Sequence, residues 1–399
     1  MRQLICILFI GLEIMGSVNA QNVKRVQRLD GSYITADSID ALVNRLLLAA
    51  KVSGMGISVL NDNKPVYTKA FGYSHAGEKI KLDTNTVMYG ASLSKAVFAF
   101  IVMHLVETKQ FDLDKPLFTY FPNFTAIGDV YTNLMKDPLW MHITARMCLS
   151  HTTGMQNIWW MDPFTGARDT VTGVKLFFMP GTRYAYSNEG IKLLQKAVEN
   201  ATGTSLSQLA DSLIFIPAGM HNTSYTWKPE YDKDSAWGHD ENEKALDKRQ
   251  SSRPNAAGSM VTTVADYSRF ISYILQGKGL GKKYFKEMTT PQIRISSKQQ
   301  FPTLRTDTTT ENDAIQLSYG LGWGLLQSPY GKGFFKEGHD DHWRNYNINF
   351  LDKKIAIVLL SNSANGESIF KELLNTIIGD QYTPIVWENY TPYNAVPRN

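Results

Sequence analysis

The spacing of apolar residues changes along the chain and predicts different elements at its ends and in its middle. Near the N-terminus, apolar residues recur at helical spacing over residues 38–51. Two strands are predicted next, over 54–60 and 65–72, because the polar turn between them is typical of a β-hairpin. The chain therefore opens helix, strand, strand.

Strand patterns return only near the C-terminus. They cover residues 319–326, 346–351 and 354–362, and a final helix is predicted over 367–378. The middle contains helical stretches such as 192–201 and 205–215, separated by long loops rich in aromatic residues. We therefore expect an α+β fold in which both ends of the chain form one antiparallel sheet flanked by helices. A mainly helical lobe, residues 112–250, would be inserted into it, with a cleft between the two parts.

The composition is that of an ordinary globular protein, with 43% hydrophobic residues. The formal net charge is +4, from 41 basic and 37 acidic residues without long runs of one sign, so no nucleic-acid partner is indicated. One cysteine, Cys148, remains after residue 20, which excludes an internal disulfide in a processed chain, and a buried apolar role is expected for it.

Residues 1–20 have the pattern of a secretory signal peptide. A basic start is followed by the apolar run 4–12 and by small residues that end at Ala20, where cleavage is predicted. The apolar run is too short to predict a membrane span, so no stable span is expected after cleavage. We expect an exported protein, periplasmic or secreted, with one catalytic domain over 21–380 and an irregular tail over 381–399.

A possible nucleophile and its base stand at the start of a predicted helix, in Ser92-Leu93-Ser94-Lys95. Lys95 follows Ser92 by one turn and shares its helix face. A buried, neutral lysine can accept the serine proton, and the helix N-terminus can stabilise the oxyanion formed on attack. The segment 368–371 also fits S-x-x-K but is predicted to be an N-capped surface helix, so the case for Ser92 depends on what accompanies it.

Two further segments carry candidate chemistry. Tyr186 and Asn188 lie two residues apart in a turn-rich loop, so both can point into one cleft, where tyrosine can move a proton and the amide can bind a carbonyl or hold a lysine. The run 338–343 precedes the strand at 346–351, and we expect its main-chain N–H groups at a strand edge, where they can complete an oxyanion hole. His339 and His342 flank two carboxylates, which leaves a metal site as an alternative. A bare H-x-x-H pair without a further ligand seldom forms such a site, so no metal or organic cofactor is expected.

Serine, lysine, tyrosine and asparagine in this order resemble the active-site motifs of the serine β-lactamase and penicillin-binding-protein superfamily. The resemblance is to the class C β-lactamase-like branch, which includes esterases and D-amino-acid peptidases. It extends over matching segments in the expected order, at 143–155, 178–190, 217–220, 257–263 and 319–323. It implies a β-lactamase/transpeptidase-like fold and a covalent acyl-enzyme.

The resemblance also implies roles for single residues. Ser92 would be the acylated nucleophile, Lys95 its proton acceptor and Tyr186 a general acid or base, while Asn188 would orient the substrate and the lysine. His339 would take the first position of the third motif, which reads K-T-G or H-x-G in the family. Asp341 then stands where glycine is usual, and we expect it to crowd the strand edge and repel anionic substrates, with His342 and Arg344 offsetting the charge.

These inferences predict an exported serine hydrolase that acts on an ester, amide or β-lactam carbonyl. Its partner would be a small-molecule or peptide substrate, with peptidoglycan-derived peptides among the candidates. Two alternatives stay open. One is a D-amino-acid peptidase or carboxylesterase rather than a true β-lactamase. The other is a catalytically inactive homologue that binds peptidoglycan or another ligand, for which Asp341 is the main support.

Overall fold

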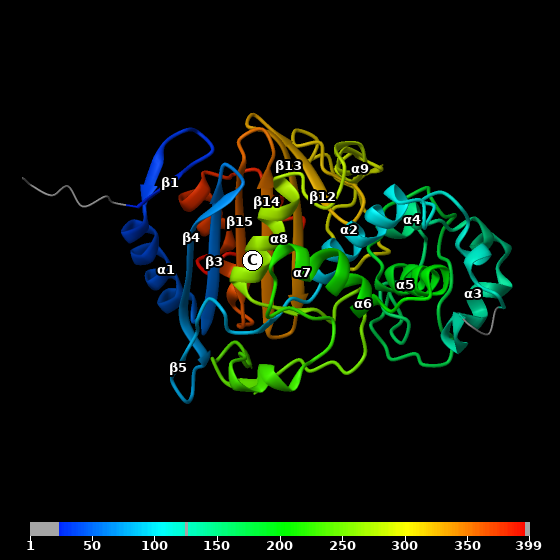
Figure 1. Cartoon of the computed structure of the whole chain (residues 1–399), viewed down its shortest axis with the longest axis horizontal. Coiled ribbons are helices and arrows are strands. Elements are labelled where there is room, and N and C mark those ends of the chain that lie inside the picture. The colour runs from blue at the N-terminus through cyan, green and yellow to red at the C-terminus, as the bar shows by residue number, and fades with distance from the viewer. Residues whose placement is uncertain (1–23, 124–126, 396–399) are drawn as a thin grey trace, which may run out of the picture.

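The centre of the molecule is a nine-stranded antiparallel sheet within the part that the computed structural model describes, residues 24–123 and 127–395 (Figure 1). Its order is β10-β11-β12-β13-β14-β15-β3-β4-β5. Strands β3 (Gly54–Asn61), β4 (Lys64–His75) and β5 (Ile80–Lys81) come from the N-terminal part of the chain. The C-terminal part supplies β10 (Ile293–Arg294), β11 (Ser318–Tyr319), β12 (Gly324–Ser328), β13 (Gly331–Asp340), β14 (Trp343–Phe350) and β15 (Ile355–Ser361). A sheet formed from both ends of the chain, as expected, is confirmed.

The strand predictions fail at one important place. The segment 319–326 is not one strand but the pair β11 and β12, because the chain turns back through Gly322, whose φ is 83°. Strand β13 was not predicted at all. Its polar and charged residues interrupt the apolar alternation that reveals β14 and β15, although Lys336 and Glu337 are both buried.

Helices cover both faces of the sheet, and the side-chain alternation of the central strands supplies a core to each. Ile57 and Ile357 contribute to the core beneath α1 (Ala36–Ala50) and the C-terminal helical segment 366–378. Leu60 and Val358 point the other way, into the core shared with α2 (Leu93–Glu107) and α8 (Val264–Leu275). Helix α2 is apolar on nearly every side and lies buried between the sheet and the inserted lobe.

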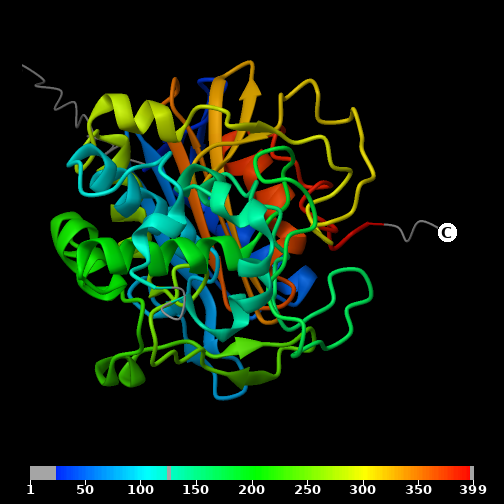
Figure 2. The same cartoon turned by 90° about the vertical axis from the view of Figure 1, so that its right-hand side faces the viewer.

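The inserted lobe lies beyond one edge of the sheet, on the right in Figure 1 and facing the viewer in Figure 2. Its helices are α3 (Thr132–Lys136), α4 (Ala145–Leu149), α5 (Asn188–Thr202) and α6 (Leu206–Ala210). The short helix α7 (Ile216–Ala218) follows beside α8 (Figure 1). The predicted helix 192–201 lies inside α5, and the predicted helix 205–215 is α6 followed by a π-helical turn. Cys148 is fully buried in α4, where desolvation raises the pKa of its thiol, in agreement with an apolar role.

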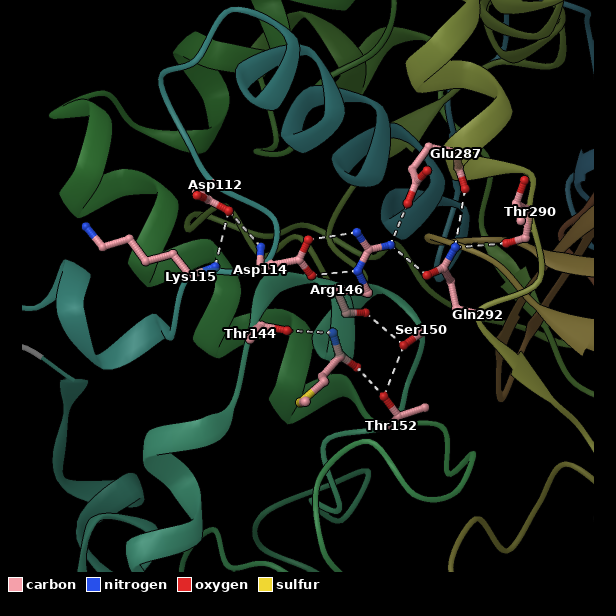
Figure 3. Close-up of polar contacts among 11 residues, drawn as sticks. Asp112, Asp114, Lys115, Thr144, Arg146, Ser150, Thr152, Glu287, Thr290 and Gln292 are labelled. Atoms are coloured by element: carbon pink, nitrogen blue, oxygen red, sulfur yellow. Dashed lines mark hydrogen bonds and ion pairs between the residues drawn. The ribbon is translucent and has the colours of Figure 1, made fainter.

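Arg146 of α4 joins the lobe to the sheet side of the molecule (Figure 3). Its guanidinium donates through Nε and Nη2 to both carboxylate oxygens of Asp114, at 2.6 and 2.9 Å. Its Nη1 donates to Glu287 of α9 (Lys282–Met288) at 2.6 Å and to Gln292 beside β10 at 2.7 Å. This planar fork fixes the short helix that leads into the loop at His151.

The C-terminal tail is irregular yet part of the core. Its described residues, 381–395, contain no helix or strand. Even so, Trp387 and Tyr390 are buried, and the Trp387 carbonyl accepts a hydrogen bond from the Gln300 N–H at 2.8 Å. No helix in the described ranges is long and apolar enough to cross a membrane. The predicted signal peptide, residues 1–20, lies outside those ranges.

Candidate active site

Ser92 stands directly before the first residue of α2 and does not use its hydroxyl to cap the helix. The Nζ of Lys95 lies 2.9 Å from the Ser92 Oγ and donates to the Ala257 carbonyl at 2.5 Å. Since Lys95 is fully buried, its amine is fixed against the serine. The predicted position of the two residues on one face of the helix is therefore the observed one.

The backbone before Ser92 is held in an unusual conformation. Ala91 has a φ of 46°, in the left-handed region that non-glycine residues seldom adopt. Ser94 keeps this turn in place, because its Oγ donates to the Ala91 carbonyl at 2.5 Å and accepts from the Met260 N–H at 3.0 Å. In the described part of the chain the Ser92 N–H has no hydrogen-bond acceptor, which leaves it available to a substrate oxygen.

The environment of Lys95 favours its neutral form. Burial lowers the pKa of the amine well below its usual value, and the positive charge of Lys336 lowers it further. A neutral amine can accept a proton, whereas an ammonium group cannot. The site therefore favours the protonation state of Lys95 that a base for Ser92 requires.

Tyr186 lies between two lysines. Its ring centre is 4.9 Å from the Lys95 Nζ and 5.0 Å from the Lys336 Nζ, and its hydroxyl is 3.5 Å from the latter. Burial, and then the carboxylate of Glu337, raise the pKa of the phenol well above its usual value, against a smaller opposite effect of its hydrogen bond with Ser92. The hydroxyl is therefore protonated at neutral pH, and it can pass a proton on rather than act as a phenolate base.

His151 supports Tyr186 from the other side. The two ring centres are 4.2 Å apart, and the imidazole Nδ1 accepts the Ser187 N–H at 3.2 Å. The His151 carbonyl also accepts the Ala185 N–H, at 2.8 Å. These bonds place the histidine in a loop-holding role rather than in a triad with Ser92.

Asn188 is the first residue of α5 and lines the same cavity as Ser92. Its N–H donates to Asn157 Oδ1 at 3.1 Å, which fixes the start of the helix. Its own Oδ1 is buried and has no hydrogen-bond partner among the described residues. The carbonyl of this amide is thus free to accept a hydrogen bond from a bound molecule.

The third predicted segment is only partly at the cavity. His339 is on β13 and lines the cavity, with its Nδ1 3.1 Å from Glu367. Asp341 and His342 form the turn between β13 and β14 and do not line it, so their expected place in the cleft is wrong. The reason is that β13 ends at Asp340, and a two-residue turn carries the next residues away from Ser92.

The metal-site alternative receives no support from these positions. His342 faces Asp247 at 3.4 Å, whereas His339 faces Glu367. Across residues 24–123 and 127–395, no group of three or more His, Cys, Asp or Glu side chains is arranged to hold a metal ion.

The structure brings Lys336, Glu337 and Gly338 to the site, whereas the sequence interpretation included neither Lys336 nor Glu337 and gave Gly338 no role of its own. Lys336 is fully buried and pairs with Glu337 at 2.7 Å. A Cβ on Gly338 would lie 2.6 Å from the Gly90 carbonyl oxygen, so only glycine lets β13 approach the segment before Ser92 this closely. These three residues fit the pattern K-x-G of the third motif. They begin three positions before His339, which the sequence interpretation had put at the first position of that motif.

The edge of β13 beside Ser92 is open. Strand β12 pairs with β13 only from Gly331 to Phe335, so residues 336–340 have β14 as a neighbour on one side and no strand on the other. The adjoining cavity has a volume of about 650 Å³ and is bounded by the α2 and α5 N-termini, the β13 edge and the C-terminal tail. Such an edge can pair with an extended substrate.

The chain belongs to the beta-lactamase family, whose model matches residues 39–377. It is 24% identical over 351 residues to penicillin-binding protein 4* of Bacillus subtilis (strain 168), covering 79% of this chain and 70% of that protein. It is 22% identical over 308 residues to a beta-lactamase of Escherichia coli (strain K12), covering 76% and 74%. The octameric penicillin-binding protein homologue from Pyrococcus abyssi shares the fold, with a TM-score of 0.68 and 21% identity over 88% of this chain and 80% of that one. The chain is thus a serine hydrolase of this family.

Proposed function

We propose that this protein is an exported hydrolase that cleaves an ester or amide through a covalent acyl-enzyme on Ser92. The observation that carries the proposal is the 2.9 Å contact between the Ser92 Oγ and a fully buried Lys95 amine. A serine hydroxyl beside a neutral base can attack a carbonyl carbon, and water then releases the acid in a second step.

The groups around Ser92 can accept its hydroxyl proton and supply a proton to the leaving group. Lys95 accepts it as the Oγ attacks, and the Tyr186 hydroxyl passes a proton to the leaving group. Burial lowers the pKa of Lys336, but its pairing with Glu337 at 2.7 Å opposes that effect and favours the ammonium form. An ammonium group 3.5 Å from the Tyr186 oxygen would stabilise the transient negative charge there. In this assignment Lys336, and not His339, takes the first position of the third motif.

The oxyanion is bound by main-chain donors. One is the Ser92 N–H at the N-terminus of α2, and the other is an N–H on the open edge of β13 between residues 337 and 339. Asn188 contributes its unpartnered Oδ1 to an N–H of the substrate. These groups orient the carbonyl between the nucleophile and its oxyanion donors.

The substrate class follows from the residues on β13. Gly338, and not Asp341, stands at the glycine position of the third motif, where it lets β13 lie close to the segment before Ser92. Asp341 therefore no longer supports an inactive binding homologue. Glu337, in the position of the K-T-G threonine, places a carboxylate in the cavity and disfavours anionic substrates. This favours an esterase, or a peptidase that acts on D-amino-acid amides without a carboxylate, over an enzyme that hydrolyses penicillins or other substrates with a carboxylate beside the scissile bond. Export rests on the signal-peptide pattern of residues 1–20.

Substrate profiling of the purified protein tests the proposal. We expect turnover of p-nitrophenyl acetate or D-alanine p-nitroanilide to exceed that of nitrocefin, and Ser92→Ala to abolish it. Ser368→Ala is the matched control, since that serine belongs to the second S-x-x-K match and lies in the C-terminal helical segment. Unchanged hydrolysis by Ser92→Ala would refute the assignment, and nitrocefin as the best substrate would refute the substrate class.

A further inference from the structure

The wall of the cavity formed by β13 and the C-terminal tail contains two buried carboxyl groups whose oxygens are not all paired with protein donors. Glu337 of β13 and Glu388 of the tail both line the cavity. Lys336 pairs with one oxygen of Glu337, Oε1, at 2.7 Å, and Gln300 donates to the same oxygen at 3.0 Å. The other oxygen, Oε2, is buried without a hydrogen-bond partner among the described residues.

Glu388 is the less satisfied of the two acids. Glu388 is only 3% exposed. Neither of its carboxyl oxygens has a hydrogen-bond partner of good geometry among the described residues. The nearby Tyr346 hydroxyl lowers the pKa of this carboxyl, but by less than burial and Glu337 raise it. A buried carboxyl without a partner costs free energy, so its retention beside a cavity indicates a ligand that satisfies it.

The surroundings of Glu388 disfavour its ionised form. Burial, and then the charge of Glu337, raise its pKa well above the usual value, whereas Lys336 opposes this only in part. A cation bound between the two acids would reverse the balance, because it would stabilise the ionised form of Glu388.

We propose that Glu337 and Glu388 bind the ammonium group of the substrate, so that the preferred acyl compounds carry a free amine. This inference rests on the proposed function for its connection to catalysis, but not for the binding itself. The site lies within reach of the reaction centre: Glu337 contacts Lys336, and Lys336 lies 3.5 Å from the Tyr186 hydroxyl. An ammonium group there would donate to Glu337 Oε2 and to Glu388.

The tail is what completes the site. Glu388 lies in a segment without helix or strand, yet Trp387 before it is buried and its carbonyl is bound by the Gln300 N–H at 2.8 Å. Gln300 also holds Glu337. One residue therefore fixes the two acids relative to each other.

Binding is measured with benzylammonium and benzyl alcohol, which have nearly the same shape and differ in charge. The protein is Ser92→Ala, so the result does not depend on turnover, and calorimetry or thermal shift gives the affinities. We expect benzylammonium to bind at least ten-fold more tightly than benzyl alcohol. Glu388→Gln should remove most of that preference while benzyl alcohol binds as before, which shows that the cavity remains intact.

The control is Glu367→Gln, because Glu367 lines the same cavity but is already paired with Arg344 at 2.8 Å. It should change the preference by less than three-fold. Equal binding of the two compounds to the parent protein would overturn the proposal. An equal loss of the benzylammonium preference in Glu388→Gln and Glu367→Gln would also overturn it, because it would indicate only a general electrostatic effect of the cavity. Failure of hydrolysis with intact benzylammonium binding would instead refute the proposed function and leave this site standing.

Discussion

Lys336 and Tyr186 are 150 residues apart in the chain, yet the lysine Nζ lies 3.5 Å from the tyrosine hydroxyl. One comes from the open edge of β13 and the other from the loop that precedes α5. The contact joins the sheet to the helical lobe at the point where Ser92 and Lys95 meet. It also identifies which lysine accompanies the proposed nucleophile and base.

Replacing Lys336 with methionine should lower kcat for an activated ester by about 10²- to 10⁴-fold, the usual range for loss of a group that assists proton transfer. The loss follows because Tyr186 keeps its place but loses the adjacent positive charge. Lys332→Met is the matched control on the same strand, since Lys332 donates to the Thr289 carbonyl and does not line the cavity. Equal kcat values for the two variants would remove Lys336 from the mechanism.

Gly338 and Asp341 give a second test of how β13 lies against Ser92. Gly338→Ala should lower activity at least ten-fold, because the new Cβ would lie 2.6 Å from the Gly90 carbonyl oxygen and push the strand away. Asp341→Gly should change activity by less than about two-fold, since Asp341 is an exposed turn residue outside the cavity. Steady-state kinetics of both variants measure these effects. A large gain of activity in Asp341→Gly would indicate that Asp341 lies in the cleft, as the sequence predicted, and not in a turn outside it.

Much of this architecture follows from the sequence, and the part that does not has a definite cause. The apolar periodicity of α1, the β3–β4 hairpin and β15 is strong, because each has a continuous buried face. Strand β13 lacks that signal, since it buries Lys336 and Glu337 as an ion pair and Gly338 against another backbone. Without the strand, the K-x-G match within it had no structural context, and the adjacent His339 was chosen instead.

The part that the C-terminal tail plays in the site could not be predicted from the sequence either. Residues 381–395 are rich in proline and have no periodicity, which is why the sequence predicts only irregular structure. The role of Glu388 in lining the cavity depends on tertiary packing of Trp387 and Tyr390, which local sequence does not encode. By contrast, Ser92 and Lys95 are one helical turn apart, so their contact follows from local geometry alone.

The pH dependence of the reaction should report on Lys95. Its neutral form is the active one, so kcat/KM should fall with decreasing pH as the amine becomes protonated. Because burial and Lys336 lower its pKa well below 10.5, this acid limb should lie well below pH 10. Tyr186→Phe should be slower but keep the same limb. A rate that rises until the pH reaches the usual lysine pKa, about 10.4, would show that the base is not a depressed lysine.

Lys95→Met should inactivate the enzyme and stabilise it. The folded-state pKa of Lys95 lies below its unfolded value, so between the two pKa values the unfolded chain binds the extra proton and stability falls as pH falls. Removing the amine should therefore add about 1–3 kcal/mol to the free energy of unfolding, with a larger gain at pH 6 than at pH 9. Chemical denaturation at both pH values measures this. Lys371→Met, at an exposed lysine, should show no such difference; a loss of stability in Lys95→Met at both pH values would contradict the account.

The central claim is that Ser92 carries the acyl group during turnover. Intact-protein mass spectrometry after brief exposure to p-nitrophenyl acetate, acid quench and peptide mapping locates that group directly. The account predicts one added acetyl group, on the peptide that contains Ser92, formed within a single turnover and absent from Ser92→Ala. An acetyl group on any other residue that forms at the rate of turnover, or its persistence in Ser92→Ala, would contradict the account.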